Sequence, residues 1–303
     1  MQTLQIPLPP IQDRLRLALR EDLGVRGDLT SRALVPWEHG ANGEFLVKAP
    51  GVLSGLHLMP LVFRLAAEET ARIERRRPAR IRTALLRKDG ARVRRGEVVA
   101  RVSGPARVLL AGERTALNLL CHLSGVASAT RRFADAIRGT KARILDTRKT
   151  TPLWRDLEKQ AVRDGGGTNH RFGLHDMVLI KDNHLALWGV NDPAAAVRAA
   201  QRRFPGVKVE VEVTTLEGLK QVCGASCPDF VLLDNFAPTD VRRAVAWIAS
   251  QGGRSRRPLL EASGGIRLET VRAYASAGVD RISLGALTHS APALDLSFEI
   301  RGS

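Results

Sequence analysis

The feature that most constrains the fold of this chain is a run of short apolar segments that alternate with helical segments after Gly112. Each apolar segment has the length of a buried strand, and each segment between them has the apolar spacing of an amphipathic helix. Repeated strand-helix units predict a parallel sheet, and six successive units favour closure or near-closure into a barrel. An open doubly wound sheet is the alternative, although no GxGxxG motif follows any of these strands.

These units predict an α/β fold class, with an incomplete α/β barrel of about six to seven parallel strands over residues 113–288. This barrel is the domain in which we expect the chemistry. The predicted strands cover residues 142–146, 177–180, 207–213, 230–233, 259–262 and 281–284. The predicted helices cover residues 113–137, 154–162, 193–203, 216–223, 238–251 and 268–277.

The first third of the chain has a different rhythm, because its apolar segments are short, alternate with period two, and are broken by Pro and Gly. Such segments are typical of a small, mostly antiparallel sheet. The predicted strands cover residues 43–49, 71–75, 80–86, 98–102 and 106–110, and the predicted helices cover residues 11–20 and 57–69. We therefore expect an N-terminal α/β sandwich domain over residues 1–112. The C-terminal segment 289–303 contains an alternating stretch, 293–300, and is expected to pack on that domain.

The net charge is strongly positive, since 47 Lys and Arg residues face 31 Asp and Glu residues, which gives +16. A basic chain favours an anionic partner. The segment from Arg72 to Arg107 holds thirteen bases against three acids, and its turn-like contexts predict a solvated face. A basic nucleic-acid-binding domain is the alternative, but the 4% aromatic content and the lack of a recognisable binding motif disfavour it. We therefore predict no nucleic-acid partner.

Cysteine usage and the N-terminal sequence favour a cytoplasmic location. The three cysteines, Cys121, Cys223 and Cys227, are too few for a disulfide scaffold and form no CxxC motif. The N-terminus has no basic start followed by an apolar core, as a signal peptide would. No run of about 18 apolar residues is present to span a bilayer, so we predict no membrane partner.

In barrels of this kind, functional side chains lie where the strands end and the loops begin. Around the first two strands these side chains are cationic, which suits a small substrate with more than one carboxylate. They are Arg148, Lys149, His170, Arg171 and Lys181. Glu212 and Asp234 end the next two strands and suit ribose hydroxyls or a hydrated Mg²⁺ ion.

The last two strands end in small residues, Ser263, Gly264, Gly265 and Gly285. In such barrels this is the usual place for a phosphate site built from backbone N–H groups and helix N-termini. Glycine suits the site because a side chain would hold a phosphate away from the backbone. The residues at the strand ends together predict a phosphorylated sugar and a dicarboxylate as the substrate pair.

Several long segments resemble the quinolinate phosphoribosyltransferase family over about residues 14–300. They include ERTALNLLCHLSGVAS (113–128), LDTRKTTP (145–152), GGGTNHRFGL (165–174), LIKDNH (179–184), EASGGI (261–266) and SLGALTHS (283–290). The resemblance implies a pentosyltransferase that acts as a homodimer or higher homo-oligomer. It implies transfer of phosphoribose from phosphoribosyl pyrophosphate to quinolinate with Mg²⁺, which releases pyrophosphate and CO₂ and gives nicotinate mononucleotide for NAD biosynthesis.

The resemblance also implies roles for individual residues. Arg148, His170, Arg171 and Lys181 would bind quinolinate, with Thr147 in the same loop. Lys149 would lie between quinolinate and the phosphoribosyl donor, and Glu212 and Asp234 would lie at the ribose and the metal; these three are the expected catalytic residues. Ser263, Gly264, Gly265 and Gly285 would bind the 5′-phosphate. Arg114 would reach the site of the neighbouring subunit.

The chain departs from the family pattern at a few positions. Leu153 and Trp154 stand where TRKTTP is usually followed by Gly-Leu, and Gln160 stands where tyrosine is common. These changes affect the expected shape of the cationic loop more than the reaction. A related family associated with molybdenum transport shares the fold and part of the motifs, but the intact NHR (169–171) and KDNH (181–184) runs favour the quinolinate enzymes.

Overall fold

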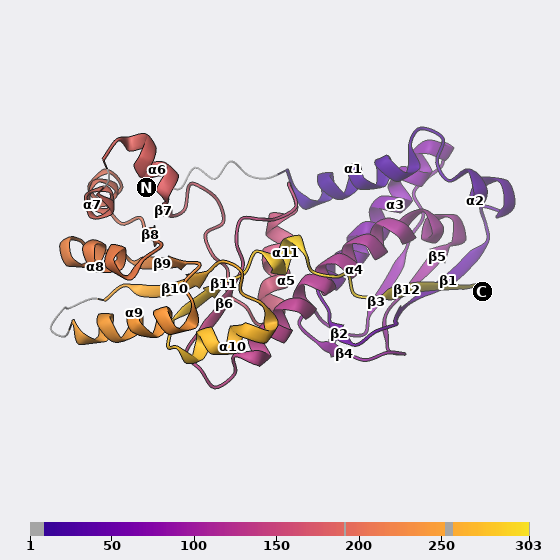
Figure 1. The fold of residues 1–303 in the computed structure, drawn as a ribbon. Coiled ribbons are helices and arrows are strands. Elements are labelled where there is room, and N and C mark those ends of the chain that lie inside the picture. The colour runs from indigo at the N-terminus through magenta and orange to yellow at the C-terminus, as the bar shows by residue number, and fades with distance from the viewer. Residues whose placement is uncertain (1–8, 191, 252–256, 303) are drawn as a thin grey trace. The chain divides into compact units, whose positions relative to one another are not determined.

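The computed structural model describes residues 9–190, 192–251 and 257–302. The chain forms two compact units (Figure 1). Unit 1 comprises the described residues up to Ser128, the segment Asp156–Gly165 and the residues from Ala291 onward. Unit 2 comprises Ala129–Arg155 and Gly166–Ser290. Among the described residues, no helix has the length and apolar character needed to cross a membrane.

Unit 2 contains a sheet of six parallel strands. The strands are β6 (Arg143–Leu145), β7 (Val178–Ile180), β8 (Val209–Val213), β9 (Phe230–Asp234), β10 (Leu259–Ser263) and β11 (Arg281–Ser283). Their order is β6-β11-β10-β9-β8-β7, so the last strand lies beside the first. Within the described residues β6 and β7 are not paired, and the barrel stays open there. The predicted incomplete α/β barrel is confirmed.

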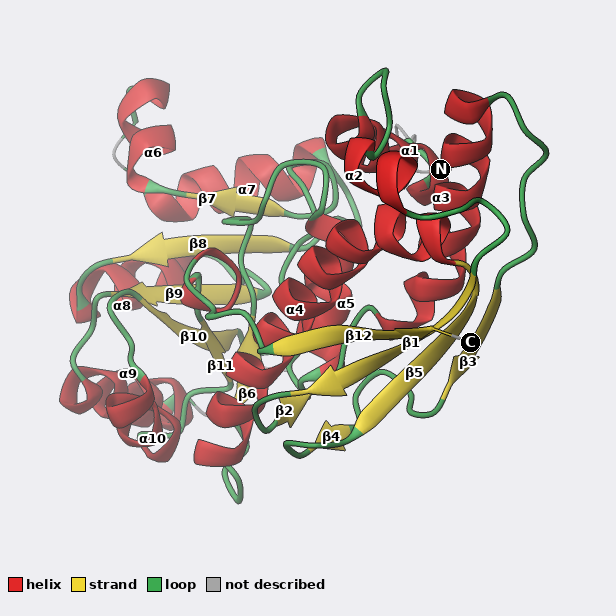
Figure 2. Cartoon of the chain, turned by 90° about the vertical axis from the view of Figure 1, so that its right-hand side faces the viewer, coloured by secondary structure: helices red, strands yellow, loops and turns green. Residues whose placement is uncertain are grey.

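Helices follow the strands of unit 2 (Figure 2). They are α6 (Asp182–Trp188), α7 (Pro193–Arg203), α8 (Leu216–Ala225), α9 (Pro238–Ser250), α10 (Leu268–Ser276) and α11 (Ala286–His289). Of these, α7, α8, α9 and α10 confirm predicted helices. The strands are buried on both faces, as parallel sheets are, and β8 shows this with Val209, Val211 and Val213 buried on one face and Glu210 buried on the other. Since all strands run in one direction, their carboxyl ends share one edge of the sheet.

Unit 1 is built on a four-stranded sheet in the order β12-β1-β5-β3. The strands are β1 (Gly40–Val47), β3 (Arg82–Leu85), β5 (Val98–Pro105) and β12 (Leu296–Gly302), all antiparallel to their neighbours. A small ladder pairs β2 (Gly51–Val52) with β4 (Arg92–Val93). The C-terminal segment thus returns as an edge strand that pairs with β1.

Unit 1 also contains several helices. They are α1 (Ile11–Leu23), α2 (Leu29–Leu34), the short 3-10 turn η1 (Leu56–Leu58), α3 (Met59–Glu74), α5 (Arg155–Asp164) and α4 (Ala106–Ala136), which belongs to unit 1 as far as Ser128. Helix α3 packs on this sheet, and α1 packs on α3. Phe63 of α3 packs against Phe45 of β1 and Phe298 of β12, with ring centroids 6.1 and 5.5 Å away. A Cβ at Gly43 would collide with the Phe298 ring, so glycine makes this packing possible.

Two predicted strands of the first third are wrong. Residues 71–75 continue helix α3 as far as Glu74, and residues 106–110 are the first turns of α4. Short alternating segments do not distinguish a strand from a helix that is buried on a broad face. In α4, Val108 and Leu109 are both fully buried, although a strand would direct these consecutive side chains to opposite faces. Helices α2, α6 and α11 were not predicted.

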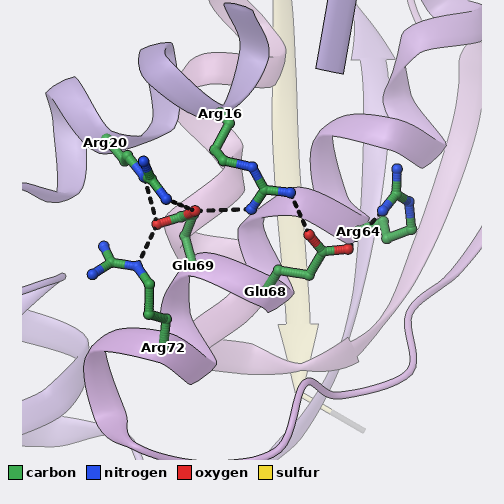
Figure 3. Close-up of polar contacts among 6 residues, drawn as sticks. All are labelled: Arg16, Arg20, Arg64, Glu68, Glu69 and Arg72. Atoms are coloured by element: carbon green, nitrogen blue, oxygen red, sulfur yellow. Dashed lines mark hydrogen bonds and ion pairs between the residues drawn. The ribbon is translucent and has the colours of Figure 1, made fainter. Parts of the chain in front are cut away.

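Unit 1 holds a charged cluster that joins α1 to α3, the Glu69 cluster of Arg16, Arg20, Arg64, Glu68, Glu69 and Arg72 (Figure 3). The Glu69 carboxylate is 1% exposed and accepts from Arg16 at 2.9 Å, Arg20 at 3.0 Å and Arg72 at 2.8 Å. Burial would raise the pKa of Glu69, but the three guanidinium groups lower it to about 2. This carboxylate therefore stays charged and connects the two helices.

The basic segment from Arg72 to Arg107 is only partly the solvated face that was predicted. Its two ends are paired inside the fold: Arg72 with Glu69, and Arg107 with Glu74 at 2.8 Å. The five arginines that were expected in turns are exposed, namely Arg75, Arg76, Arg77, Arg94 and Arg95. Part of the positive charge thus holds unit 1 together, and the rest faces solvent.

Candidate active site

A pocket of about 610 Å³ opens among the residues that follow the strands of unit 2. Twelve of the thirteen predicted site residues line it: Thr147, Arg148, Lys149, His170, Arg171, Lys181, Glu212, Asp234, Ser263, Gly264, Gly265 and Gly285. They come from all six strand ends or the loops beside them, which explains how residues so distant in sequence meet. Arg114 lies in unit 1, where its side chain is exposed on α4.

The cationic part of the pocket contains like charges close together. Arg148 is exposed in the loop after β6, and the Nη1 of Arg171 donates to the Met177 carbonyl at 3.0 Å. Burial and then the charge of Arg148 lower the pKa of the Arg171 guanidinium. Among the described residues, neither arginine forms an ion pair with a carboxylate. Two guanidinium groups that repel each other in one pocket are suited to an anion between them.

Lys149 is held above Gly285. The backbone N–H of Lys149 donates to Thr147 Oγ1 at 3.1 Å, and its carbonyl accepts from Thr288 Oγ1 at 2.7 Å. A Cβ at Gly285 would lie 2.8 Å from Lys149 Cδ. Since φ of Gly285 is an ordinary −64°, glycine is needed there for space rather than for conformation. A side chain at this position would push the lysine aside.

The acidic part of the pocket lies on β8 and β9. Glu212 Oε2 is 3.0 Å from Lys181 Nζ, and the lysine side chain is 44% exposed. Asp234 Oδ2 accepts from Asn235 Nδ2 at 3.0 Å. These oxygens are the hard ligands that Mg²⁺ prefers, and an ion that keeps several waters needs only one or two of them. The carboxylates therefore fit a hydrated Mg²⁺ ion chemically.

The loop after β10 has a conformation that only glycine adopts easily. Gly264 has φ +93° and Gly265 has φ +59°. A Cβ at Gly264 would collide with the Asn235 side chain, whereas the space around Gly265 is open. Successive backbone N–H groups in such turns form concave anion sites. The loop is thus shaped to bring its backbone close to an anion.

Beneath the pocket lies a buried cluster of His170, Glu210 and Glu261. His170 Nε2 is 3.0 Å from Glu210 Oε2 and 3.2 Å from Glu261 Oε1, and both glutamates are fully buried. Burial opposes the charged ring, but hydrogen bonds with the two carboxylates raise the pKa of His170 to about 9. His170 Nδ1 accepts the backbone N–H of Arg171 at 2.7 Å, a bond that a second ring proton would break. Nε2 therefore carries a proton toward the glutamates, and the second ring proton that the raised pKa favours would have to displace the Arg171 N–H from Nδ1.

These three residues offer ligand atoms within 4.8 Å of one another, a spacing that a metal ion could use. Arg281 Nε, however, lies 2.9 Å from Glu261 Oε2, so a cation already neutralises this carboxylate. Burial raises the pKa of Glu210, and the nearby Glu261 charge adds to this rise. Burial also opposes the charge of Glu261, but the hydrogen bond from His170 and the charge of Arg281 lower its pKa. The cluster is therefore an ion-pair network that supports the pocket.

Sequence reasoning missed part of this support. Asp146 is fully buried and accepts the His170 backbone N–H at 2.8 Å and Asn169 Nδ2 at 2.6 Å, which fixes the segment that carries Arg171. The signal was present, because acids inside apolar strands such as VEVEV and ILD must be paired when buried. Arg267 and His289 also line the pocket and were not predicted as site residues.

The positions at which the chain departs from the family pattern lie in different units. Leu153 has φ +67° and is 58% exposed, so a leucine occupies a left-handed conformation that glycine adopts without cost. Gln160 lies on α5 in unit 1, where its amide donates to Asp164 at 2.7 Å. Leu153 and Trp154, whose N–H donates to the Thr151 carbonyl at 3.1 Å, therefore belong to the cationic loop itself, whereas Gln160 does not.

The family models and the individual relatives match one family over nearly the whole chain. The family described as "Quinolinate phosphoribosyl transferase, C-terminal domain" matches residues 126–299, and the corresponding N-terminal domain matches residues 28–124. The carboxylating nicotinate-nucleotide pyrophosphorylase of Mycobacterium leprae is 44% identical over 95% of this chain and 96% of its own. A probable enzyme of the same name from Bacillus subtilis is 40% identical over 92% of this chain and 90% of its own.

Solved structures show the same fold. The NadC protein of Streptococcus pyogenes has a TM-score of 0.85 and 37% identity, over 99% of this chain and 100% of its own. The nicotinate-nucleotide pyrophosphorylase of Francisella tularensis has a TM-score of 0.84 and 33% identity, over 99% of each chain. The likeness therefore extends over both units.

Proposed function

The chain belongs to the quinolinate phosphoribosyltransferase family, and we propose that the pocket of unit 2 is where it performs this family's reaction. The protein is a pentosyltransferase of NAD biosynthesis. It transfers the phosphoribosyl group of phosphoribosyl pyrophosphate to quinolinate, and gives nicotinate mononucleotide, pyrophosphate and CO₂.

The observation that carries the assignment of the pocket is the pair of guanidinium groups of Arg148 and Arg171. They line one pocket, and the charge of Arg148 disfavours that of Arg171. A dicarboxylate between them relieves this repulsion and accepts charge-assisted hydrogen bonds. Quinolinate carries two carboxylates on adjacent ring carbons, so it can engage both arginines while its ring stays in the plane between them.

The residues of the pocket then divide the work of the reaction. Loss of pyrophosphate builds positive charge on the ribose ring, and carboxylates at Glu212 and Asp234 stabilise it. The pyridine nitrogen attacks the anomeric carbon as its bond to pyrophosphate breaks, and the ring becomes a pyridinium. The positive ring stabilises the electron pair left on the ring carbon when the adjacent carboxylate leaves as CO₂, and that carbon then takes up a proton from water. Lys149, held above Gly285, supplies a positive charge between the two substrates. Positioning and electrostatics thus carry the reaction without a dedicated acid-base pair.

We propose a positioning role for His170 beside its expected contact with quinolinate. Both ring nitrogens have partners within unit 2, Nε2 with the two glutamates and Nδ1 with the backbone of Arg171. The ring therefore holds the Arg171 backbone in place, and a direct contact with a substrate carboxylate requires the ring to release one of these partners.

We propose Mg²⁺ as the cofactor, with Glu212 and Asp234 as the residues that hold it, directly or through water. Support comes from the donor chemistry of two carboxylates that line one pocket. The ion would neutralise the charge that develops on the departing pyrophosphate. Because Lys181 pairs with Glu212, we expect quinolinate to draw Lys181 toward a substrate carboxylate and so free Glu212.

We further propose a homodimer or higher homo-oligomer in which Arg114 acts at the partner's pocket. Its side chain is exposed on α4 and is absent from the residues that line the pocket of its own chain. Mixing Arg114→Ala with Lys149→Ala protein tests the proposal. If the site is shared, the two inactive variants regain about a quarter of the wild-type activity per site after subunit exchange. No recovery despite proven exchange would contradict a shared site.

We also propose a cytoplasmic location, in line with three cysteines that form no disulfide among the described residues. The reaction itself is tested with purified protein, Mg²⁺, phosphoribosyl pyrophosphate and quinolinate, by following nicotinate mononucleotide and CO₂. Equal activity on nicotinate, which lacks the second carboxylate, would contradict the assignment of the arginine pair. Omitting Mg²⁺ in the presence of a chelator is expected to abolish turnover, and full activity there would contradict the proposed cofactor.

A further inference from the structure

Arg267 is a pocket residue that neither the sequence pattern nor the resemblance singled out. It follows the loop of Gly264 and Gly265, and its side chain is exposed and lines the same pocket as the predicted site residues. Among the residues that the structure describes, no acidic side chain forms an ion pair with it. A cation that lines a substrate pocket without an acidic partner has its charge available to a ligand.

The backbone of Arg267 is fixed on both sides. Its N–H donates to Thr270 Oγ1 at 3.0 Å, and its carbonyl accepts the N–H groups of Thr270 and Val271 at 3.1 and 2.8 Å. The preceding residue, Ile266, is buried in the core of unit 2. The base of the side chain therefore has a defined position, and only the long stem and the guanidinium group are left to adjust to a ligand.

An arginine at position 267 is unfavourable for the stability of the helix that begins there. Arg267 is the N-cap of α10, where Ser, Thr, Asp and Asn are preferred and where the helix dipole disfavours a cation. Elsewhere in unit 2, helices α7 and α8 are capped in the preferred way, by the side chains of Asp192 and Thr215, whereas α9, which contacts α10, has Ala237 as its N-cap and no side-chain cap. An anion at this helix start would offset the unfavourable dipole interaction, since it would pair with the guanidinium and face the helix N-terminus.

We infer that Arg267 is a further substrate-binding residue, which contacts the 5′-phosphate that phosphoribosyl pyrophosphate and nicotinate mononucleotide share. The inference rests on the proposed function of the pocket. The 5′-phosphate is favoured over the pyrophosphate because Arg267 lies two residues beyond the open Gly265 turn, where backbone N–H groups are available to the same anion. Glu212 and Asp234, the carboxylates expected to lie at the ribose and the metal, are on other strands, β8 and β9. This is the second reason to favour the 5′-phosphate over the pyrophosphate.

The test compares Arg267→Ala with the wild type through ligands that carry different phosphates. Losing a charge-assisted contact to phosphate weakens binding about 10-fold to 100-fold. We expect the KM for phosphoribosyl pyrophosphate and the Kd for nicotinate mononucleotide to rise together by this factor. The Kd for quinolinate and the inhibition constant for pyrophosphate are expected to stay within twofold, and Arg267→Lys is expected to recover part of the loss.

Arg242→Ala is the matched control, since Arg242 is an exposed arginine on the neighbouring helix α9 that does not line the pocket. If Arg267→Ala behaves like this control, the inference is wrong. If pyrophosphate inhibition weakens while nicotinate mononucleotide binding does not, Arg267 contacts the leaving group and the inference is again wrong. A wild-type protein that binds neither phosphoribosyl pyrophosphate nor nicotinate mononucleotide would instead contradict the proposed function itself.

Discussion

Arginine is used in opposite ways in the two units. In the Glu69 cluster of unit 1, three guanidinium groups surround a carboxylate that is 1% exposed, and every charge has a partner within the fold. In the pocket of unit 2, the charge of Arg148 lowers the pKa of Arg171, and neither guanidinium group forms an ion pair with an acid among the described residues. The first arrangement stabilises a helix pair, and the second leaves cations available for a substrate. A structural cluster thus differs from a binding site mainly in whether its charged side chains have partners of opposite charge within the fold.

The largest effect is expected from Lys149→Ala, which removes a cation of the pocket. We expect kcat to fall about 1000-fold, because a positive charge between the substrates is lost from the transition state. The free energy of unfolding should hardly change, since the lysine amine has no acidic partner among the described residues. Steady-state kinetics and urea unfolding measure the two quantities, with Lys220→Ala on the surface of α8 as control. A loss of more than about 1 kcal/mol in the free energy of unfolding would show that Lys149 also stabilises the fold, which would contradict the contrast between the two units.

For Glu69→Gln we expect the opposite result, a loss of stability without a loss of activity. The substitution leaves three guanidinium groups around a neutral amide, so we expect the free energy of unfolding of unit 1 to fall by about 2 to 3 kcal/mol. KM and kcat of the folded protein should stay within twofold. Urea unfolding and kinetics at 20 °C check both, with Glu217→Gln on the exposed side of α8 as control. A large loss of activity in fully folded protein would show that the cluster also serves the pocket.

The pH dependence of the same cluster follows from the low pKa of Glu69. The folded-state pKa of about 2 lies below the ordinary value of 4.5, so the stabilisation is fully present above pH 4.5 and is lost as the pH falls toward 2. The stability difference between wild type and Glu69→Gln should therefore be constant from pH 7 to pH 5. It should shrink steadily from pH 4.5 to pH 2.5. A difference that does not depend on pH would show that the carboxylate is not charged in the fold.

The smallest effect is expected at Leu153 in the loop of the pocket. Its φ of +67° costs a leucine about 1 kcal/mol, which glycine avoids, although glycine also makes the unfolded chain more flexible. We expect Leu153→Gly to raise the free energy of unfolding by about 0.5 kcal/mol. Leu153→Ala is the control, because it removes the side chain but keeps the backbone cost. Equal effects of the two substitutions would show that the left-handed backbone does not matter here.

The sequence predicted unit 2 much better than unit 1. Buried parallel strands such as VEVEV are separated by long amphipathic helices, so their pattern is unambiguous, and the residues after them meet at one edge of the sheet. In unit 1 the alternating pattern predicted a strand over 106–110, and this prediction was wrong because only the packing of α4 shows that these residues are helical. The ion pairs of the buried acids beside the pocket, such as Glu261 with Arg281, could not be predicted, because they depend on which strands become neighbours.

The pairing of β12 with β1 has a consequence for how the protein is made. Phe45 lies opposite Phe298, so an edge of the first sheet is completed by residues about 250 positions later in the chain. During synthesis β1 and β5 emerge first, and the ribosome must finish nearly the whole chain before the last strand can join them. Throughout that time β1 presents an open edge, which a chaperone or another nascent chain can reach. Deleting the last strand is therefore expected to produce aggregation during expression.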